Sequence, residues 1–126
     1  MKKIILTDQA PAPIGPYSQA ILSGDTLYVS GQIPLNPQSG TLMMGSIEEQ
    51  TKQVMENLSA VLKKVEMTFE NVVKATIFIT NMDNFTKINS VYGSYFSEGY
   101  APARETVQVS RLPKDVNVEI SVIAIR

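Results

Sequence analysis

Two charged side chains near the end of the sequence have types that suit the chemistry of a small acid. Arg104 and Glu119 lie within APARETVQVSRLPKDVNVEI, residues 101–120, on either side of a proline-bearing turn. A guanidinium can bind a carboxylate through two parallel hydrogen bonds, and a glutamate can orient a water molecule and exchange protons with it. On residue type alone, a structural ion pair between the two charges is the simpler interpretation.

Composition narrows the chemistry that the 126 residues can perform. The chain has no cysteine and no histidine, which excludes disulfides, thiol nucleophiles, imidazole bases and the usual zinc or copper ligands. The net charge is −1 and the basic residues are scattered, so nucleic acid is not expected as the primary partner. The apolar run after Lys2 and Lys3 is too short for a signal peptide or a membrane span, which favours a cytoplasmic protein.

Two amphipathic helices are predicted to support the site. The first begins at Ser46, where Glu49 completes the spacing of a capping box, and runs to about Glu66. Its apolar stripe indicates core packing, although a partner-binding helix has the same pattern. Asp83 is predicted to cap the second, whose apolar side chains recur at three- or four-residue steps. These are Phe85, Ile88, Tyr92, Tyr95 and Phe96, before Gly99 and Pro102 end the helix.

The remaining periodic segments read as strands, bounded by glycine- and proline-rich turns. Ser23-Gly24-Asp25 suits the turn of an early hairpin. The expected strands are residues 3–6, 17–22, 27–30, 72–80, 106–110 and 116–125, with extended or looped segments at 10–16 and 34–41. Because strands and helices are mixed without a linker or a repeat, the chain is predicted to be one α+β domain, residues 1–126, with two helices on one face of a sheet.

The last two strands are apolar on both faces, as their valine and isoleucine content shows. Two helices can cover only one face of the sheet. A homo-oligomer that packs the remaining faces together would cover the other.

Three sequence blocks resemble the RidA/YjgF family of enamine and imine deaminases. They are GPYSQA at residues 15–20, SGQIP at residues 30–34, and PAR…VQVSRLPKD…VEI from Pro102 to Ile120. The resemblance implies a chorismate-mutase-like fold with a mixed sheet, assembled as a homotrimer with sites between subunits. It also implies hydrolysis of 2-aminoacrylate, 2-iminopropanoate and 2-iminobutanoate to 2-oxo acids and ammonia, with no cofactor and no metal.

The resemblance also implies roles for individual residues. Arg104 matches the carboxylate-binding arginine, and Glu119 matches the glutamate thought to position or activate water. Further positions match residues that line the same cleft and bind substrate: Tyr17, Ser30, Gly31, Asn89 and Thr106. For Tyr17, covering the sheet edge is an equal alternative.

Two departures from the family pattern stand beside Arg104. Thr106 occupies a position that is often cysteine, and Glu105 one where a small residue is usual. Glu105 could compete with an anionic substrate or form a pair at a subunit interface. Strand alternation points it to the opposite face from Arg104 and Thr106, which favours the interface. These departures keep open an alternative function, a ligand-sensing or regulatory trimer that binds small carboxylates without turnover.

The spacing of Arg104 and Glu119 sets a condition on the fold. In a simple hairpin about the Pro113-Lys114 turn, Arg104 would lie roughly 17 Å from Glu119 at the usual rise of a strand, too far for one small imino acid to touch both. The resemblance implies that the strand at residues 72–80 lies between them. The two charges are therefore expected to converge from different directions or from different subunits.

Overall fold

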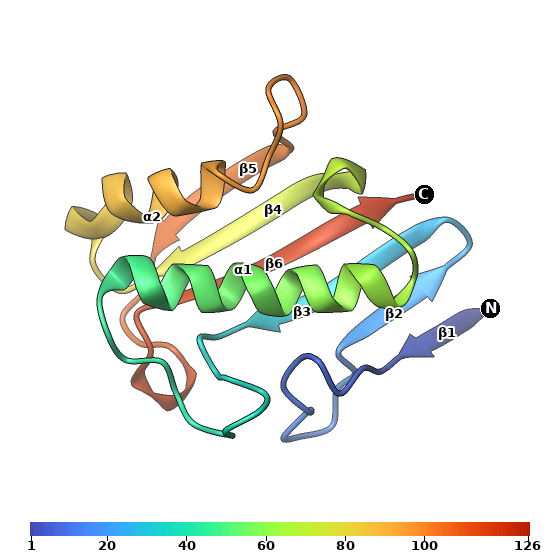
Figure 1. Ribbon diagram of the computed structural model, residues 1–126, viewed down its shortest axis with the longest axis horizontal. Helices are drawn as coiled ribbons and strands as arrows, with labels where there is room; N and C mark the ends of the chain where they lie inside the picture. Colours follow the sequence, from blue (N-terminus) through green and yellow to red (C-terminus); the bar gives the residue numbers. More distant parts are fainter.

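The computed structural model describes all residues from 1 to 126, as one six-stranded mixed sheet with two helices on one face (Figure 1). The strand order is β1-β2-β3-β6-β4-β5, and only β4 and β5 pair in parallel. The strands are β1 (Lys2–Ile5), β2 (Ala20–Ser23), β3 (Thr26–Gln32), β4 (Val72–Ile79), β5 (Ala103–Gln108) and β6 (Val118–Ile125). The expected α+β architecture is confirmed, and β4 does lie between the strands of Arg104 and Glu119.

Helix α1 (Ile47–Lys64) begins where the capping pattern predicted. The hydroxyl of Ser46 accepts a hydrogen bond from the Glu49 N–H at 3.1 Å, which satisfies one of the free donors of the first turn. Val54, Leu58 and Leu62 are fully buried against the sheet, so core packing explains the apolar stripe. The helix ends two residues before the predicted Glu66, which has a φ of 59° and cannot continue a right-handed helix.

Helix α2 (Phe85–Gly93) is shorter than predicted, and Asp83 does not cap it. A short 3₁₀ turn, Met82–Asn84, precedes the helix, and the side chain capping that turn is Asn81, whose amide oxygen accepts from the Asp83 N–H. Asn competes with Asp for this role because both have a short oxygen acceptor. Tyr95 and Phe96 follow the helix in tight turns and still pack on the core.

The strands near the candidate site also differ from the prediction. Strand β5 begins at Ala103 rather than at residue 106, so Arg104 lies inside this strand rather than before it. Strand β2 begins at Ala20, which leaves Tyr17 in the segment before it. The remaining 3₁₀ turns are Phe69–Asn71 and Pro113–Asp115. No helix has the length and apolarity that crossing a bilayer requires.

The sheet has one covered face and one open face. Its buried side chains alternate along each strand and point toward the helices, as Ala75, Ile77 and Ile79 do in β4. The strand register aligns a row of apolar side chains on the opposite face, which no element of the chain covers. This open-face row consists of Ile4, Ile21, Tyr28 and Ile123.

Candidate functional site

Arg104 lies on the edge strand β5 with its side chain toward α2. Its Nη1 donates a hydrogen bond to the Oδ1 of Asn89, and its guanidinium lies 5.1 Å from the ring centre of Tyr92 and 5.7 Å from that of Phe85. Arg104 forms no ion pair within the chain. A cation held by a neutral amide and two aromatic rings keeps its charge available for an anion.

Thr106 points to the same face as Arg104, two residues further along β5. Its Oγ1 is buried and has no hydrogen-bond partner in the chain, a condition shared only with the hydroxyl of Tyr92. The N–H of Val109 donates to the carbonyl of Ile79 on β4. Because the main-chain groups of successive strand residues point to alternate sides, the N–H and C=O of Thr106, three residues earlier, point away from β4 at the free edge of the sheet. Arg104, Asn89 and Thr106 thus form one polar group at the sheet edge, which we call the arginine half-site.

Glu105 lies on the opposite face from Arg104, as alternation predicted. Its carboxylate is 2.9 Å from the Nζ of Lys74 and accepts a hydrogen bond of 2.7 Å from the Thr76 hydroxyl. The pKa of this carboxyl is lowered, chiefly by the hydrogen bond from Lys74 and secondly by the hydrogen bond from Thr76. The partner expected across a subunit interface is therefore found in the same chain, because β4 pairs Thr76 directly with Glu105.

Glu119 stands on β6, on the open face of the sheet, beside an irregularity in β3. Val29 pairs with Val122 and Gln32 with Ile120, so Ser30 and Gly31 together oppose one residue of β6 in a β-bulge. The Glu119 carboxylate fills the space that a side chain at Gly31 would take, since a Cβ there would lie 2.3 Å from its Oε2. Partial burial without a charged partner raises the pKa of Glu119.

Tyr17 and Ser30 lie near Gly31. The Ser30 hydroxyl donates to the main-chain oxygen of Ser18 at 2.6 Å, which ties the bulge to the segment carrying Tyr17. Tyr17 and Gly31 line the same small hollow, and Tyr17 is half-exposed. We call Glu119, Gly31, Ser30 and Tyr17 the glutamate half-site.

The chain does not bring its two half-sites together. In the sheet register, Arg104 pairs with Ala75, which faces the helices, whereas Glu119 pairs with Phe78 on the open face. The sheet itself separates the two charges, so they form neither an ion pair nor a common pocket within one subunit. The simple structural ion pair is thereby contradicted.

Sequence reasoning missed the aromatic neighbours of Arg104. The sequence pattern indicates Phe85 and Tyr92 only as recurring apolar side chains of the second helix, although Phe85, Asn89 and Tyr92 have the i, i+4, i+7 spacing of one helical face. That spacing was the available signal. It could not identify the strand facing these side chains, because the pairing of β5 is set by contacts distant in sequence.

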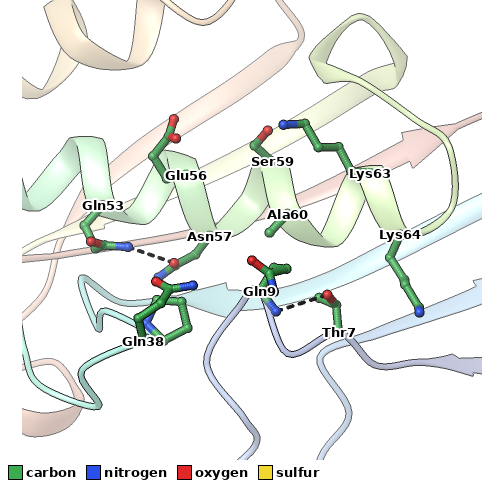
Figure 2. Close-up of a pocket in the computed structure, with 11 residues that line it drawn as sticks. Thr7, Gln9, Gln38, Gln53, Glu56, Asn57, Ser59, Ala60, Lys63 and Lys64 are labelled. Carbon is green, nitrogen blue, oxygen red and sulfur yellow. Dashed lines mark hydrogen bonds between the residues drawn. The ribbon is translucent and has the colours of Figure 1, made fainter.

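A separate polar groove of about 520 Å³ lies between α1 and the loops that follow β1 and β3 (Figure 2). None of the predicted site residues lines it. Its central side chain, Asn57, is already satisfied: it donates to the carbonyls of Ile33 and Leu35 and accepts from Gln53. We therefore assign this residue to holding the loop after β3. No group of three acidic side chains gathers anywhere in the chain as a possible metal site.

Replacing Gly31 with alanine tests the glutamate half-site separately from folding. The new methyl group would occupy the position of the Glu119 carboxylate, which can rotate away because it ends a flexible side chain. We expect the melting temperature to change little and any turnover that depends on Glu119 to fall at least tenfold. Gly24→Ala is unsuitable as a control because its φ of 59° adds strain, whereas Gly93→Ala meets open space on a helix and should leave turnover unchanged.

The whole chain is highly similar in sequence and in fold to known proteins. The sequence model of a family described as "Endoribonuclease L-PSP" matches residues 7–126. A bovine protein named 2-iminobutanoate/2-iminopropanoate deaminase is 45% identical over 126 residues, covering 100% of this chain and 91% of the relative. The crystal structure of the Rid family protein YyfA from Yersinia pestis has a TM-score of 0.97 at 51% identity, with 100% of both chains covered. That of E. coli TdcF with bound serine has a TM-score of 0.93 at 42% identity, with 98% of both covered.

Proposed function

The chain belongs to the YjgF/RidA family, and we propose that it hydrolyses small 2-imino acids and their enamine tautomers to 2-oxo acids and ammonia. The observation that carries the proposal is the unpaired guanidinium of Arg104 at the sheet edge, held by neutral groups. A substrate carboxylate would supply the missing anion. The deaminase name of the bovine relative and the serine bound to TdcF both support a small amino-acid-like ligand.

The reaction needs one group to hold the acid and another to deliver water. Arg104 would bind the carboxylate of the substrate through its planar fork, which fixes the adjacent C=N carbon in space. Glu119 would accept a proton from water as the water oxygen bonds to that carbon, and would pass this proton to the nitrogen to give a carbinolamine. When the carbinolamine collapses, Glu119 would carry its hydroxyl proton to the nitrogen while the C–N bond breaks, so that ammonia leaves and the C=O of the 2-oxo acid remains. Every step uses water and proton transfer alone.

We further propose that the protein acts as a homotrimer in which two subunits complete each site. One support is the position of Arg104 and Glu119 on opposite faces of the sheet, which prevents one chain from presenting both to a small molecule. The other is the open face, where large apolar side chains lie exposed, including Tyr28 at 50% and Ile4 at 62%. Packing open faces against each other would remove this apolar surface from water.

Replacing Ile123 with aspartate tests the proposed assembly. Ile123 stands on the open face, paired with Tyr28 on one side and Lys74 on the other, outside the helix-facing core. A carboxylate there would be unfavourable in an apolar interface but tolerable on an exposed sheet. We expect sedimentation velocity to show a smaller species with unchanged far-ultraviolet circular dichroism, and deamination to be lost. An Ile123→Asp variant that stays trimeric would place the interface elsewhere. Ser94→Asp, at the exposed C-cap of α2, serves as the control.

The catalytic proposal is tested by supplying the unstable substrate continuously. A pyridoxal phosphate-dependent serine dehydratase releases 2-aminoacrylate, whose conversion to pyruvate is followed in the presence and absence of this protein. We expect acceleration above the spontaneous rate in proportion to the protein added. Saturable binding of pyruvate without acceleration would select the alternative function, a ligand-sensing trimer. If the protein neither binds pyruvate nor accelerates its formation, both functions are rejected.

A further inference from the structure

The aromatic ring of Tyr92 lies closest to the guanidinium of Arg104 among the rings of the chain. We infer that Tyr92 is a positioning residue, whose buried ring holds the guanidinium in the orientation that receives the substrate's carboxylate. The inference rests on the proposed function, in which Arg104 binds that carboxylate. Tyr92 itself is not a catalytic residue, because it acts through Arg104.

Three side chains on one face of α2 set the direction of the Arg104 side chain. Asn89 binds one nitrogen, Nη1, and the rings of Tyr92 and Phe85 stand 5.1 Å and 5.7 Å from the guanidinium carbon. No hydrogen bond in the chain occupies Nε or Nη2 of Arg104. A long, flexible arginine is thereby held at one nitrogen and over two aromatic rings. The edge formed by Nε and Nη2 remains free for two hydrogen bonds to an anion.

The ring of Tyr92 is itself immobilised by the aromatic core. It is only 4% exposed and packs on Phe96 at 4.9 Å between ring centres, while Phe96 contacts Phe69 at 5.4 Å. Phe85, in contrast, is the first residue of the helix and only partly buried. Tyr92 is therefore the ring that transmits a fixed position from the core to Arg104. A cation over a desolvated ring is held more firmly than one over an exposed ring.

The hydroxyl of Tyr92 does not explain why an aromatic residue stands here. It is buried without a hydrogen-bond partner, which is unfavourable for a polar group. Burial also raises the pKa of Tyr92 to about 12 despite the opposing effect of Arg104, so the ring carries no charge near neutral pH. Removing the hydroxyl should thus leave the positioning effect in place, whereas removing the ring should abolish it.

Calorimetric titration with pyruvate separates the ring from the hydroxyl. We expect Tyr92→Leu to raise the dissociation constant about five- to thirtyfold, the range of a cation–ring contact. Tyr92→Phe should restore affinity to within about twofold of the wild type, because a phenyl ring also attracts the cation. In an Arg104→Ala background, Tyr92→Leu should add less than about a twofold change, since residues that act through one contact are not additive.

Tyr95→Leu is the matched control, because the ring of Tyr95 packs on Phe69 in the same aromatic core but contacts neither the ring of Tyr92 nor Arg104. A similar rise in dissociation constant for Tyr95→Leu and Tyr92→Leu would overturn the inference, as general loosening of the core would explain both. Unchanged affinity in Tyr92→Leu would overturn it as well. If that variant does not fold, Tyr92→Met fills the space without a ring and takes its place. Loss of folding in both would assign Tyr92 to the core alone.

The same titration distinguishes failure of this inference from failure of the proposed function. If the wild type binds pyruvate and accelerates deamination while Tyr92→Leu matches it, only the positioning role is rejected. If the wild type neither binds pyruvate nor accelerates deamination, the carboxylate site is rejected, and the role of Tyr92 with it.

Discussion

Replacing Arg104 with alanine is expected to lower kcat/KM for 2-aminoacrylate by about 30-fold to several thousandfold. This range corresponds to about 2–5 kcal/mol, the cost of truncating one partner of a buried charge pair. In the free chain no anion neutralises Arg104, so the loss would come from the missing contact with the substrate. Steady-state kinetics with the coupled dehydratase measures the effect, and direct titration shows whether it lies in binding.

Two further variants show whether charge or geometry is responsible. Arg104→Lys keeps the positive charge but loses the planar fork and the contact of the guanidinium with the Tyr92 ring, so we expect only partial recovery. Lys87→Ala removes an exposed cation from the same helix that carries Asn89 and should leave kcat/KM unchanged. An Arg104→Ala variant with wild-type kinetics would remove Arg104 from the site.

Replacing Glu119 with glutamine is expected to lower kcat by about 10²- to 10⁴-fold while affecting pyruvate binding much less. The amide keeps the shape of the carboxylate but cannot accept a proton from water, and general-base catalysis contributes a factor of this size. Rapid-quench or continuous assays of pyruvate formation measure kcat, and titration measures the affinity. Equal losses in kcat and in pyruvate affinity would instead indicate a binding role for Glu119.

The raised pKa of Glu119 also predicts a dependence on pH. Because partial burial disfavours the charged form, the carboxylate ionises above the usual pH for glutamate, and activity should fall as pH drops through this raised pKa. For stability the sign is opposite. The folded state binds the proton of Glu119 more tightly than the unfolded state does. Glu119 therefore lowers the free energy of unfolding as pH rises from its pKa in the unfolded chain through its raised pKa in the folded chain. Glu119→Gln should lose the acidic limb of the rate profile and be no less stable at neutral pH.

Local sequence patterns predicted the elements better than their ends. The first helix was found because Ser46 and the apolar stripe point to the same structure. The end of the second helix was missed because Tyr95 and Phe96 keep the helical spacing of core residues while their backbone forms tight turns. The start of β5 was missed because Ala103 and Arg104 become strand only by pairing with β4. Such pairing depends on residues far away in the chain, which no local pattern records.

The candidate site was predicted as a set of residues but not as a geometry. Period-two alternation gave the faces of Arg104, Glu105 and Thr106 correctly, since it depends only on the strand itself. It could not relate Arg104 to Glu119, whose faces are linked through β4 and the bulge at Gly31. The contact between Arg104 and Tyr92 was also out of reach, because it needs the packing of α2 on the sheet edge.

The location of Arg104 and Glu119 on opposite faces of one sheet has a genetic consequence. If each site takes the arginine from one subunit and the glutamate from its neighbour, two inactive variants can complement each other. Arg104→Ala and Glu119→Gln subunits can be unfolded together and refolded as mixed trimers. An intact site would form wherever the Glu119 of an Arg104→Ala subunit meets the Arg104 of a Glu119→Gln neighbour. Random assembly in a cyclic trimer gives about one intact site in four. Activity near a quarter of the wild type would support shared sites, whereas an absence of recovered activity would reject sharing between subunits.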